Sequence, residues 1–204
     1  ELTEAIIGMH GRTSGSIELD GKQLIGRNVK QVLDMGVGFV PEDRTEDGLV
    51  AEFTIAENLM LDRSDRKPFA KGLSLQLTYL KKFAQEKLQQ FDIRAQGIES
   101  KASQLSGGNQ QKVVLARELS RELRLLVASQ PTRGLDVGSI EFVHEQIVAT
   151  RDSGIPVLIV ATELDEATQL GDRIAVMYKG KVVGVVPSTT PRSVLGQMMA
   201  GISA

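Results

Sequence analysis

Residues 105–111 place a serine and two glycines directly before a predicted helix. Glycines let the backbone approach an anion closely, and a helix N-terminus offers unpaired N–H groups and the positive end of the helix dipole. The Ser106 hydroxyl adds a further donor. Ser106, Gly107 and Gly108 are therefore a candidate phosphate-binding group, although the same three residues are also an ordinary turn and helix cap.

A second polar segment follows an apolar strand. The predicted strand begins at Leu125 and ends at Ser129-Gln130, and it leads into the turn Pro131–Asp136. In an open α/β sheet, ligands bind at the carboxyl ends of the strands. The two segments together therefore indicate a phosphate-handling site over residues 105–136.

The composition excludes several classes of function. The chain has 204 residues, no cysteine and a net charge of −2, and 4% of its residues are aromatic. The length predicts one domain with room for a subdomain. Without cysteine there is no disulfide, zinc–thiolate site or thiol nucleophile. The charge and the few aromatics argue against nucleic acid as a partner. No apolar run is long enough to cross a membrane.

Periodicity and turn residues predict alternating helices and strands. We expect helices at 1–9, 28–35, 54–61, 75–91, 137–152, 163–170 and 191–199, strands at 36–40, 125–129 and 157–161, and hairpins at 16–25 and 173–186. Residues 42–48 are expected to form a charged loop, residues 63–72 a connection, and the strand at 157–161 is expected to be buried on both faces. This alternation predicts an α/β fold with a parallel sheet and a mostly helical insertion.

With both segments in this order, the sequence resembles the nucleotide-binding domains of ATP-binding cassette (ABC) transporters. Residues 105–111 resemble the signature motif of that family, and residues 130–136 resemble the end of its Walker B strand and its D-loop. We call them the signature segment and the turn segment. The resemblance covers essentially the whole chain and implies a RecA-like P-loop NTPase core with a mainly parallel sheet, β-hairpins and an inserted helical subdomain at about residues 52–120. It assigns nucleotide contact to Leu105, Ser106, Gly107, Gly108 and Gln110, and a D-loop to Gly134, Leu135 and Asp136.

Three segments are most similar to the C-terminal half of double-cassette ATPases that serve simple-sugar and nucleoside importers. They are residues 40–44, 109–111 and 131–138. Glu42 occupies the family's Q-loop glutamine position, where it is either a carboxylate on the magnesium side or a solvated loop acid. The run Ala128–Pro131 favours the nucleoside branch. Arg133 either contacts a partner or lies in a solvated turn.

Departures from the family pattern decide the expected mechanism. No phosphate-binding Walker A loop precedes the first helix, so the domain is expected to span residues 1–204 without its Walker A start. Ser129 stands at the Walker B aspartate, Gln130 at the catalytic glutamate and Thr162 at the switch histidine. A hydroxyl gives a divalent cation no charge, and an amide cannot accept a proton, a loss that costs a factor of about 10²–10⁴. We therefore expect no intact catalytic residue, no metal site and no activity in this chain alone.

Cassettes of this family pair head to tail, so that each signature faces the nucleotide of the other. We therefore expect the signature segment to act in trans on ATP and Mg²⁺ held by a partner cassette, the N-terminal half of the same polypeptide. Transmembrane permease subunits and an external solute-binding protein complete the expected assembly. The chain itself is expected to be cytoplasmic and peripheral on the inner face of the cell membrane.

Two other classes of function remain open at this stage. A soluble ABC-type ATPase of DNA repair or translation shares the fold and signature, but residues 52–104 are too short for the coiled coil of such proteins and the charge is unsuitable. An interaction module that binds no nucleotide is the other alternative. ATP binding by the full-length pair discriminates this class from an importer.

Overall fold

The structure is a computed structural model that describes residues 1–11 and 13–202. Its contacts divide the chain into two compact units, one from Glu1 to Leu158 and one that begins at Ile159. Among the described residues, no helix is long and apolar enough to cross a bilayer.

A sheet of three strands carries the fold. The strands β3 (Val37–Val40), β6 (Leu125–Ser129) and β7 (Val157–Val160) follow one another in the order β3-β6-β7. β3 and β6 pair in parallel, with Val37 opposite Leu125 and Val40 opposite Ala128. Parallel neighbours require a long crossover, and residues 41–124 supply it. The predicted α/β class with a mainly parallel sheet is confirmed.

One prediction about this sheet is wrong. The run at residues 157–161 was expected to be buried on both faces, but the residues of β7 are only half-buried. β7 stands at the end of the strand order, with β6 as its neighbour. The position at the end of the order does not by itself explain this, since β3 at the other end is mostly buried.

The N-terminal elements pack against the sheet. α1 (Leu2–Ile7) ends at Gly8 in the left-handed region (φ 80°), and α2 (Val29–Asp34) begins at Asn28, which forms a capping box with Gln31. A hairpin of β1 (Glu18–Leu19) and β2 (Lys22–Gln23) turns through Asp20 and Gly21, both with positive φ. The core shared by these elements consists of Ile6, Ile7, Leu24, Val32, Val37 and Val127.

Residues 42–48 are not the plain loop that the sequence predicts. Arg44–Gly48 form a turn of π-helix, η1. The Asp43 carboxylate accepts hydrogen bonds from the Thr45 and Glu46 N–H groups at 2.8 and 3.2 Å. These bonds fix the first residues of the turn, as a cap fixes the start of a helix.

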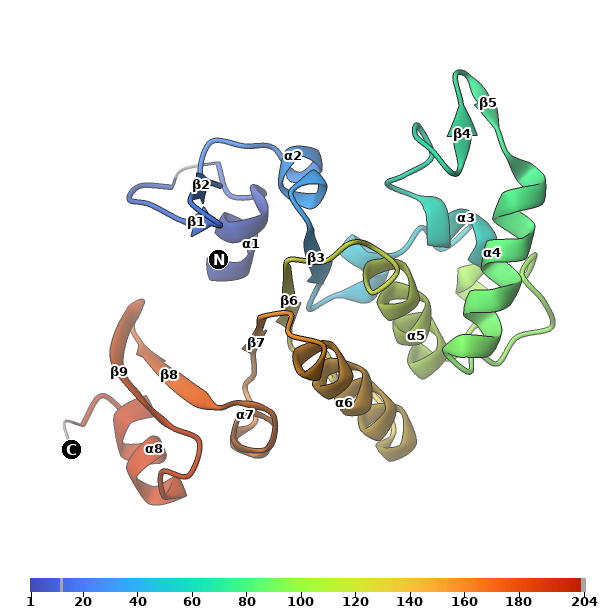
Figure 1. Cartoon of the computed structure of the whole chain (residues 1–204). Coiled ribbons are helices and arrows are strands. Elements are labelled where there is room, and N and C mark those ends of the chain that lie inside the picture. Colours follow the sequence, from blue (N-terminus) through green and yellow to red (C-terminus); the bar gives the residue numbers. More distant parts are fainter. Residues whose placement is uncertain (12, 203–204) are drawn as a thin grey trace. The chain divides into compact units, whose positions relative to one another are not determined.

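The crossover is largely helical. It contains α3 (Ile55–Met60), α4 (Leu77–Gln90), the 3₁₀ turn η2 (Ala102–Gln104) and α5 (Gly107–Glu118). Thr54 and Glu57 form the capping box that starts α3. Spacing along α4 predicts an inner face of Leu80, Phe83, Leu88 and Phe91, and of these Leu80 and the C-cap Phe91 are buried whereas Phe83 and Leu88 are half-buried. Figure 1 shows α4 lying against α3, away from the sheet.

The connection predicted at residues 63–72 is wrong in its last part. β4 (Ala70–Lys71) pairs with β5 (Ser74–Leu75) in a tight hairpin, and the following helix starts at Leu77 rather than Leu75. Strands of two residues are too short to show alternation in a sequence.

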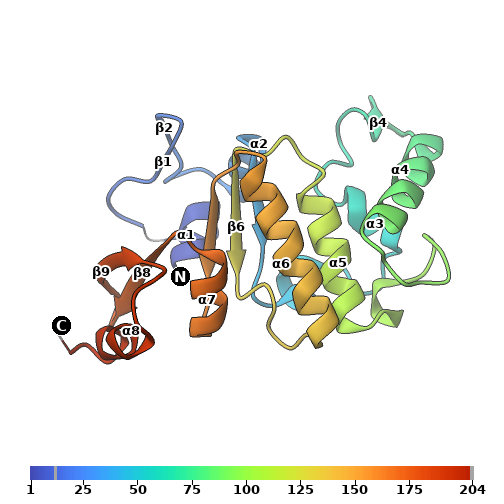
Figure 2. The same ribbon diagram turned by 60° about the horizontal axis from the view of Figure 1, so that its bottom comes forward.

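α6 (Val137–Asp152) completes the first unit and runs beside α5 (Figure 2). Ile140, Val143 and Ile147 are spaced to share one face of this helix, and Val143 and Ile147 are buried while Ile140 is half-buried.

The second unit contains α7 (Leu164–Leu170), β8 (Arg173–Tyr178), β9 (Lys181–Pro187) and α8 (Arg192–Met199). β8 and β9 form the predicted hairpin through Lys179 and Gly180, both with positive φ. α8 packs on β8 and buries Leu195 completely.

Candidate functional site

The signature segment forms the start of α5, as the sequence predicts. Ser106 is the N-cap, and its hydroxyl accepts hydrogen bonds from the Asn109 Nδ2 amide at 2.9 Å and from the Asn109 backbone N–H at 3.5 Å. The Ser106 side chain is exposed. Since the first N–H groups of a helix have no partner inside it, this end of α5 can bind an anion.

The two glycines of this segment allow close packing inside the chain. A Cβ atom on Gly108 would lie 2.1 Å from the Ser139 hydroxyl, and one on Gly107 would lie 2.6 Å from Arg44 Nη2. The contact at Gly108 is with the first turn of α6, whereas the contact at Gly107 is with the flexible end of a side chain. Gly108 therefore has a packing requirement of its own, independent of any ligand.

The turn segment is hydrogen-bonded to α5, the helix that begins in the signature segment. The Gln111 Nε2 amide donates a buried hydrogen bond of 2.7 Å to the carbonyl of Pro131. Asp136 caps α6 and accepts from the Ser139 N–H at 3.0 Å and from the Ser139 hydroxyl at 2.7 Å. These bonds from Ser139 lower the pKa of Asp136. The structure thus brings the two segments together, 20 residues apart along the chain at Gln111 and Pro131.

Two arginines connect the Q-loop position to the turn segment. Arg133 forms an ion pair with Glu42, and the Arg44 guanidinium donates to the carbonyl of Arg133 at 3.2 Å. The Glu42 side chain is 43% exposed, so water also reaches this pair. Neither interpretation of Glu42 from the sequence includes this contact, because Glu42 and Arg133 are 91 residues apart. The only indication of this contact in the sequence is the cation Arg133 itself, in the turn segment.

The end of β6 carries no carboxylate. Ser129 is 6% exposed, and Gln130 has a backbone φ of 45° in the left-handed region. That region costs a residue with a side chain about 1 kcal/mol. Thr162 lies after β7 in the second unit and is exposed. Grouping Thr162 with Ser129 and Gln130 stays a prediction.

The donor set at this end of the sheet does not suit Mg²⁺. A hydroxyl and an amide terminate the strand, and the carboxylates Glu42 and Asp136 are engaged by Arg133 and Ser139. Within residues 1–11 and 13–202, no group of three or more histidine, aspartate or glutamate side chains is placed to hold a metal ion.

The opposite end of α5 is anchored by a buried ion cluster. The Glu118 carboxylate accepts from Arg117 at 2.7 Å, from Arg121 at 2.9 Å and from the Phe39 N–H at 3.2 Å. Arg117 also donates to the Gly48 carbonyl at 2.8 Å. Burial raises the pKa of Glu118, but the two arginines outweigh it and the net pKa is lowered. The cluster fixes α5 against β3 and η1, and so fixes the signature segment.

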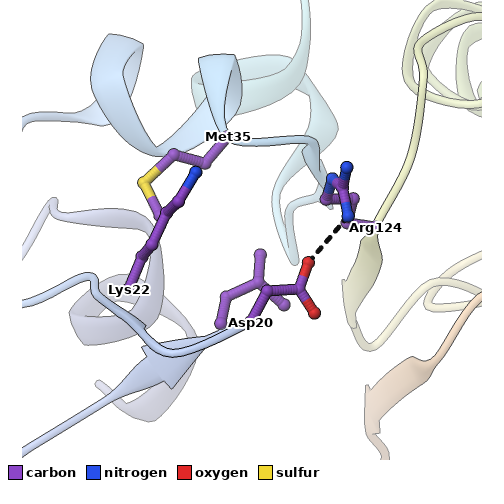
Figure 3. A pocket seen from close by; sticks show the side chains of 5 residues that line it. Asp20, Lys22, Met35 and Arg124 are labelled. Carbon is purple, nitrogen blue, oxygen red and sulfur yellow. Dashed lines mark hydrogen bonds and ion pairs between the residues drawn. The ribbon is translucent and has the colours of Figure 1, made fainter.

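Two hollows lie outside these segments. One of about 400 Å³ is bordered by α2 and the residues after α3, including Val29, Leu33 and Leu61. A smaller one of about 110 Å³ is lined by Lys22, Met35 and the ion pair between Asp20 and Arg124, at 2.9 Å (Figure 3). The smaller hollow falls below the roughly 300 Å³ at which small-molecule sites begin. Neither hollow contains a residue of the two segments.

Comparison with known proteins gives the same family as the motifs at residues 105–136. The model of the ABC transporter family matches residues 1–133. The chain is 45% identical over 202 residues to the nucleoside import ATP-binding protein NupA of Lactococcus lactis subsp. cremoris, covering 98% of the chain and 40% of that protein. It is 42% identical, with the same coverage, to the guanosine import ATP-binding protein NupO of Bacillus subtilis.

A sugar relative and a solved structure extend the comparison. The arabinose import ATP-binding protein AraG of Mannheimia succiniciproducens is 36% identical over 91% of the chain and 37% of its own length. The chain therefore spans about 40% of the curated relatives it matches. The dimeric ATP-binding cassette MJ0796, bound to ADP and phosphate, has the same fold, with a TM-score of 0.75 at 23% identity over 93% of this chain and 80% of that one. The chain belongs to the ABC transporter family and is an ATPase domain close to the nucleoside and sugar import ATP-binding proteins.

Proposed function

We propose that this chain is the signature-donating, non-hydrolysing half of an ATPase that energises the import of a nucleoside or simple sugar. The observation that carries the proposal is the contrast within one unit. The N-terminus of α5 is open and has Ser106 and Gly107 in place, whereas the adjacent end of β6 has Ser129 and Gln130 where catalysis needs carboxylates. Such a domain can serve a nucleotide held elsewhere but cannot activate water for its own.

The signature segment has the chemistry for an anion presented from outside the chain. The N–H groups at the start of α5 and the Ser106 hydroxyl donate hydrogen bonds, and the helix dipole favours negative charge. The Arg44 guanidinium lies beside Gly107 and adds a fixed positive charge. In our proposal Leu105, Ser106, Gly107, Gly108 and Gln110 contact ATP that, together with Mg²⁺, is bound to a partner cassette.

The degenerate positions assign hydrolysis to the partner. Without a carboxylate at Gln130 the chain lacks a general base, and without one at Ser129 it lacks a charged magnesium ligand. Thr162 would complete the loss at the switch position. Gly134, Leu135 and Asp136 would form the D-loop at the dimer interface, where the hydrogen bonds that Asp136 accepts from Ser139 join this loop to the start of α6.

The proposed assembly is larger than this chain. Relatives such as NupA are more than twice as long as the matched region, which supports a partner cassette in the N-terminal half of the same polypeptide. Residues 52–120 would be the helical subdomain, and the Walker A loop would lie outside residues 1–204. Permease subunits would dock at the hollow of about 400 Å³ beside Val29, Leu33 and Leu61. The domain would work on the cytoplasmic face of the membrane, with a solute-binding protein outside.

The test is to mix this chain with the separately produced N-terminal cassette and measure ATP turnover. We expect little turnover from this chain alone and a clear rise on mixing. Ser106→Ala with Gly107→Ala should abolish the rise, because one lost donor of this type costs a factor of about 10²–10³. Ser103→Ala with Gly97→Ala is the matched control, since Ser103 is exposed and a Cβ on Gly97 meets nothing within 4 Å. A rise that survives the signature substitutions contradicts the proposal.

A further inference from the structure

The hairpin of β4 and β5 presents leucines to the solvent. Its two-residue turn consists of Gly72, with a φ of 63°, and Leu73, whose relative exposure is 109%. Hairpin turns are normally built from glycine, asparagine and aspartate, which water solvates well or which adopt positive φ easily. Leu75 and Leu77, on the strand and helix that follow, are 43% and 58% exposed. We call residues 69–77 the leucine hairpin. Figure 1 shows its strands extending beyond α3 and α4.

The leucine hairpin lies in a segment with charge of one sign. Residues 66–85 contain no aspartate or glutamate, in a chain whose net charge is −2. Arg66 pairs with Asp34 and Asp65, but neither Lys67 nor Lys71 forms an ion pair with any residue that the structure describes. The cations of the segment are Arg66, Lys67, Lys71, Lys81 and Lys82.

The base of the hairpin is rigid. Phe69 is 1% exposed, and its ring packs edge-on against Tyr79 and Phe83 at centroid distances of 5.4 and 5.1 Å. The Gln76 N–H donates to the Phe69 carbonyl at 2.8 Å, which closes the hairpin. The exposed leucines are thus held in position before any partner arrives. A preorganised surface loses less conformational entropy on binding.

We propose that the leucine hairpin binds the surface of an anionic membrane, with Leu73 and Leu75 at the boundary between headgroups and acyl chains and Lys67 and Lys71 facing the lipid headgroups. Exposed leucines beside unpaired lysines are the combination that binds to such interfaces. Cytoplasmic loops of membrane proteins carry an excess of lysine and arginine, so they do not complement this hairpin in charge, whereas anionic lipids do. The inference rests on the proposed function, because that function brings the domain to a membrane.

Co-sedimentation of the complete chain with lipid vesicles tests the binding. The chain should bind vesicles of phosphatidylcholine with phosphatidylserine and leave vesicles of phosphatidylcholine alone in solution. Lys67→Ala with Lys71→Ala should weaken binding by about twenty-five-fold, since each cation near an anionic surface contributes about five-fold. Leu73→Glu should abolish it. Ile202→Glu is the matched control, because Ile202 is 59% exposed and lies outside the hairpin. These measurements use no nucleotide and no partner cassette, so their failure is separate from failure of the proposed function.

A fluorescence arm distinguishes lipid from protein as the partner. The chain has no tryptophan, so Leu73→Trp introduces a single reporter at the tip of the hairpin. Its emission should shift to shorter wavelength on the anionic vesicles and be quenched by brominated phospholipid. In the assembled importer, a shift without quenching by brominated lipid would assign the hairpin to the permease and overturn the proposal. Absence of vesicle binding, or equal binding by the Leu73→Glu variant, would overturn it as well.

Discussion

The start of α5 and the end of β6 are neighbours with opposite compositions. The first retains serine and two glycines at an open helix N-terminus, and the second has a buried hydroxyl and an amide where the family pattern places carboxylates. Yet Gln111 is bonded to Pro131, and Gly108 lies against Ser139. The turn that follows β6 therefore supports the start of α5. Packing at this place is required by the signature segment, whatever the role of the hydroxyl and the amide at the end of β6.

The first test of this contrast between the start of α5 and the end of β6 is made at the buried ion cluster that anchors α5. Glu118→Gln should destabilise the chain by about 3–5 kcal/mol, because it leaves the buried charges of Arg117 and Arg121 without their partner. Urea unfolding followed by circular dichroism measures the change. Glu122→Gln, at an exposed position four residues further along the chain, should alter stability by less than about 0.5 kcal/mol. Equal effects of the two substitutions would show that the cluster does not fix α5.

The same carboxylate predicts a pH dependence. The pKa of Glu118 is lower in the folded chain than its ordinary value. The stability that it contributes is therefore fully present above the pKa of the unfolded state and is lost as pH falls through the folded pKa. Acid titration of the unfolding free energy should show this loss in the native chain and a flatter curve in Glu118→Gln. Parallel curves would contradict the assignment.

The contact between the two segments is tested next. Gly108→Ala should destabilise the chain by about 1–3 kcal/mol, because the new methyl group overlaps the Ser139 hydroxyl and the first turn of α6. Gly107→Ala should cost less, since its methyl group meets only the end of the Arg44 side chain. Thermal unfolding of both variants gives the ranking. Gly196→Ala, in a helix where a Cβ meets nothing within 4 Å, should be neutral or stabilising. The reverse order for Gly107 and Gly108 would remove the distinction between them.

The strained residue at the strand end predicts a small gain. Gln130→Gly should stabilise the chain by about 0.5 kcal/mol, because glycine adopts the left-handed conformation without the steric cost of a side chain. Ser103→Gly should instead lose a similar amount, since Ser103 lies in the 3₁₀ turn η2. Chemical denaturation at several protein concentrations checks both. A loss on Gln130→Gly would mean that the Gln130 side chain contributes more than its backbone costs.

The smallest effect is expected at the exposed pair of Glu42 and Arg133. Arg133→Ala should cost about 0.3 kcal/mol at low salt, because water screens both side chains. Added salt should reduce the difference further. A cost of the size expected for Gly108→Ala, unchanged by salt, would show that the bridge is a structural anchor of the turn segment.

The local features of this fold can be predicted from the sequence. Asn28 and Thr54 each stand three residues before a glutamine or glutamate, and both form the capping boxes that this spacing favours. The positive φ values at Asp20-Gly21 and Lys179-Gly180 follow from residues suited to tight turns. The signature segment and the turn segment indicated the family because each motif is an unbroken run of residues in the sequence.

The contacts that hold the site together could not be predicted from the sequence in the same way. Two of these contacts join residues far apart in the chain, namely Arg44 with Gly107 and Arg133 with Glu42. No local pattern in the sequence indicates which residue each arginine contacts. The leucine hairpin was also missed, because its strands have two residues each. Propensity and periodicity describe neighbours along the chain, whereas these features depend on the packed structure.

The central claim is that the start of α5 serves catalysis and the end of β6 does not. ATP turnover by the full-length polypeptide, with Gly107→Ala compared against Gln130→Ala, tests it most directly. We expect a loss of about a hundred-fold for Gly107→Ala and a change of less than about two-fold for Gln130→Ala. A large loss on Gln130→Ala with turnover retained in Gly107→Ala would contradict it.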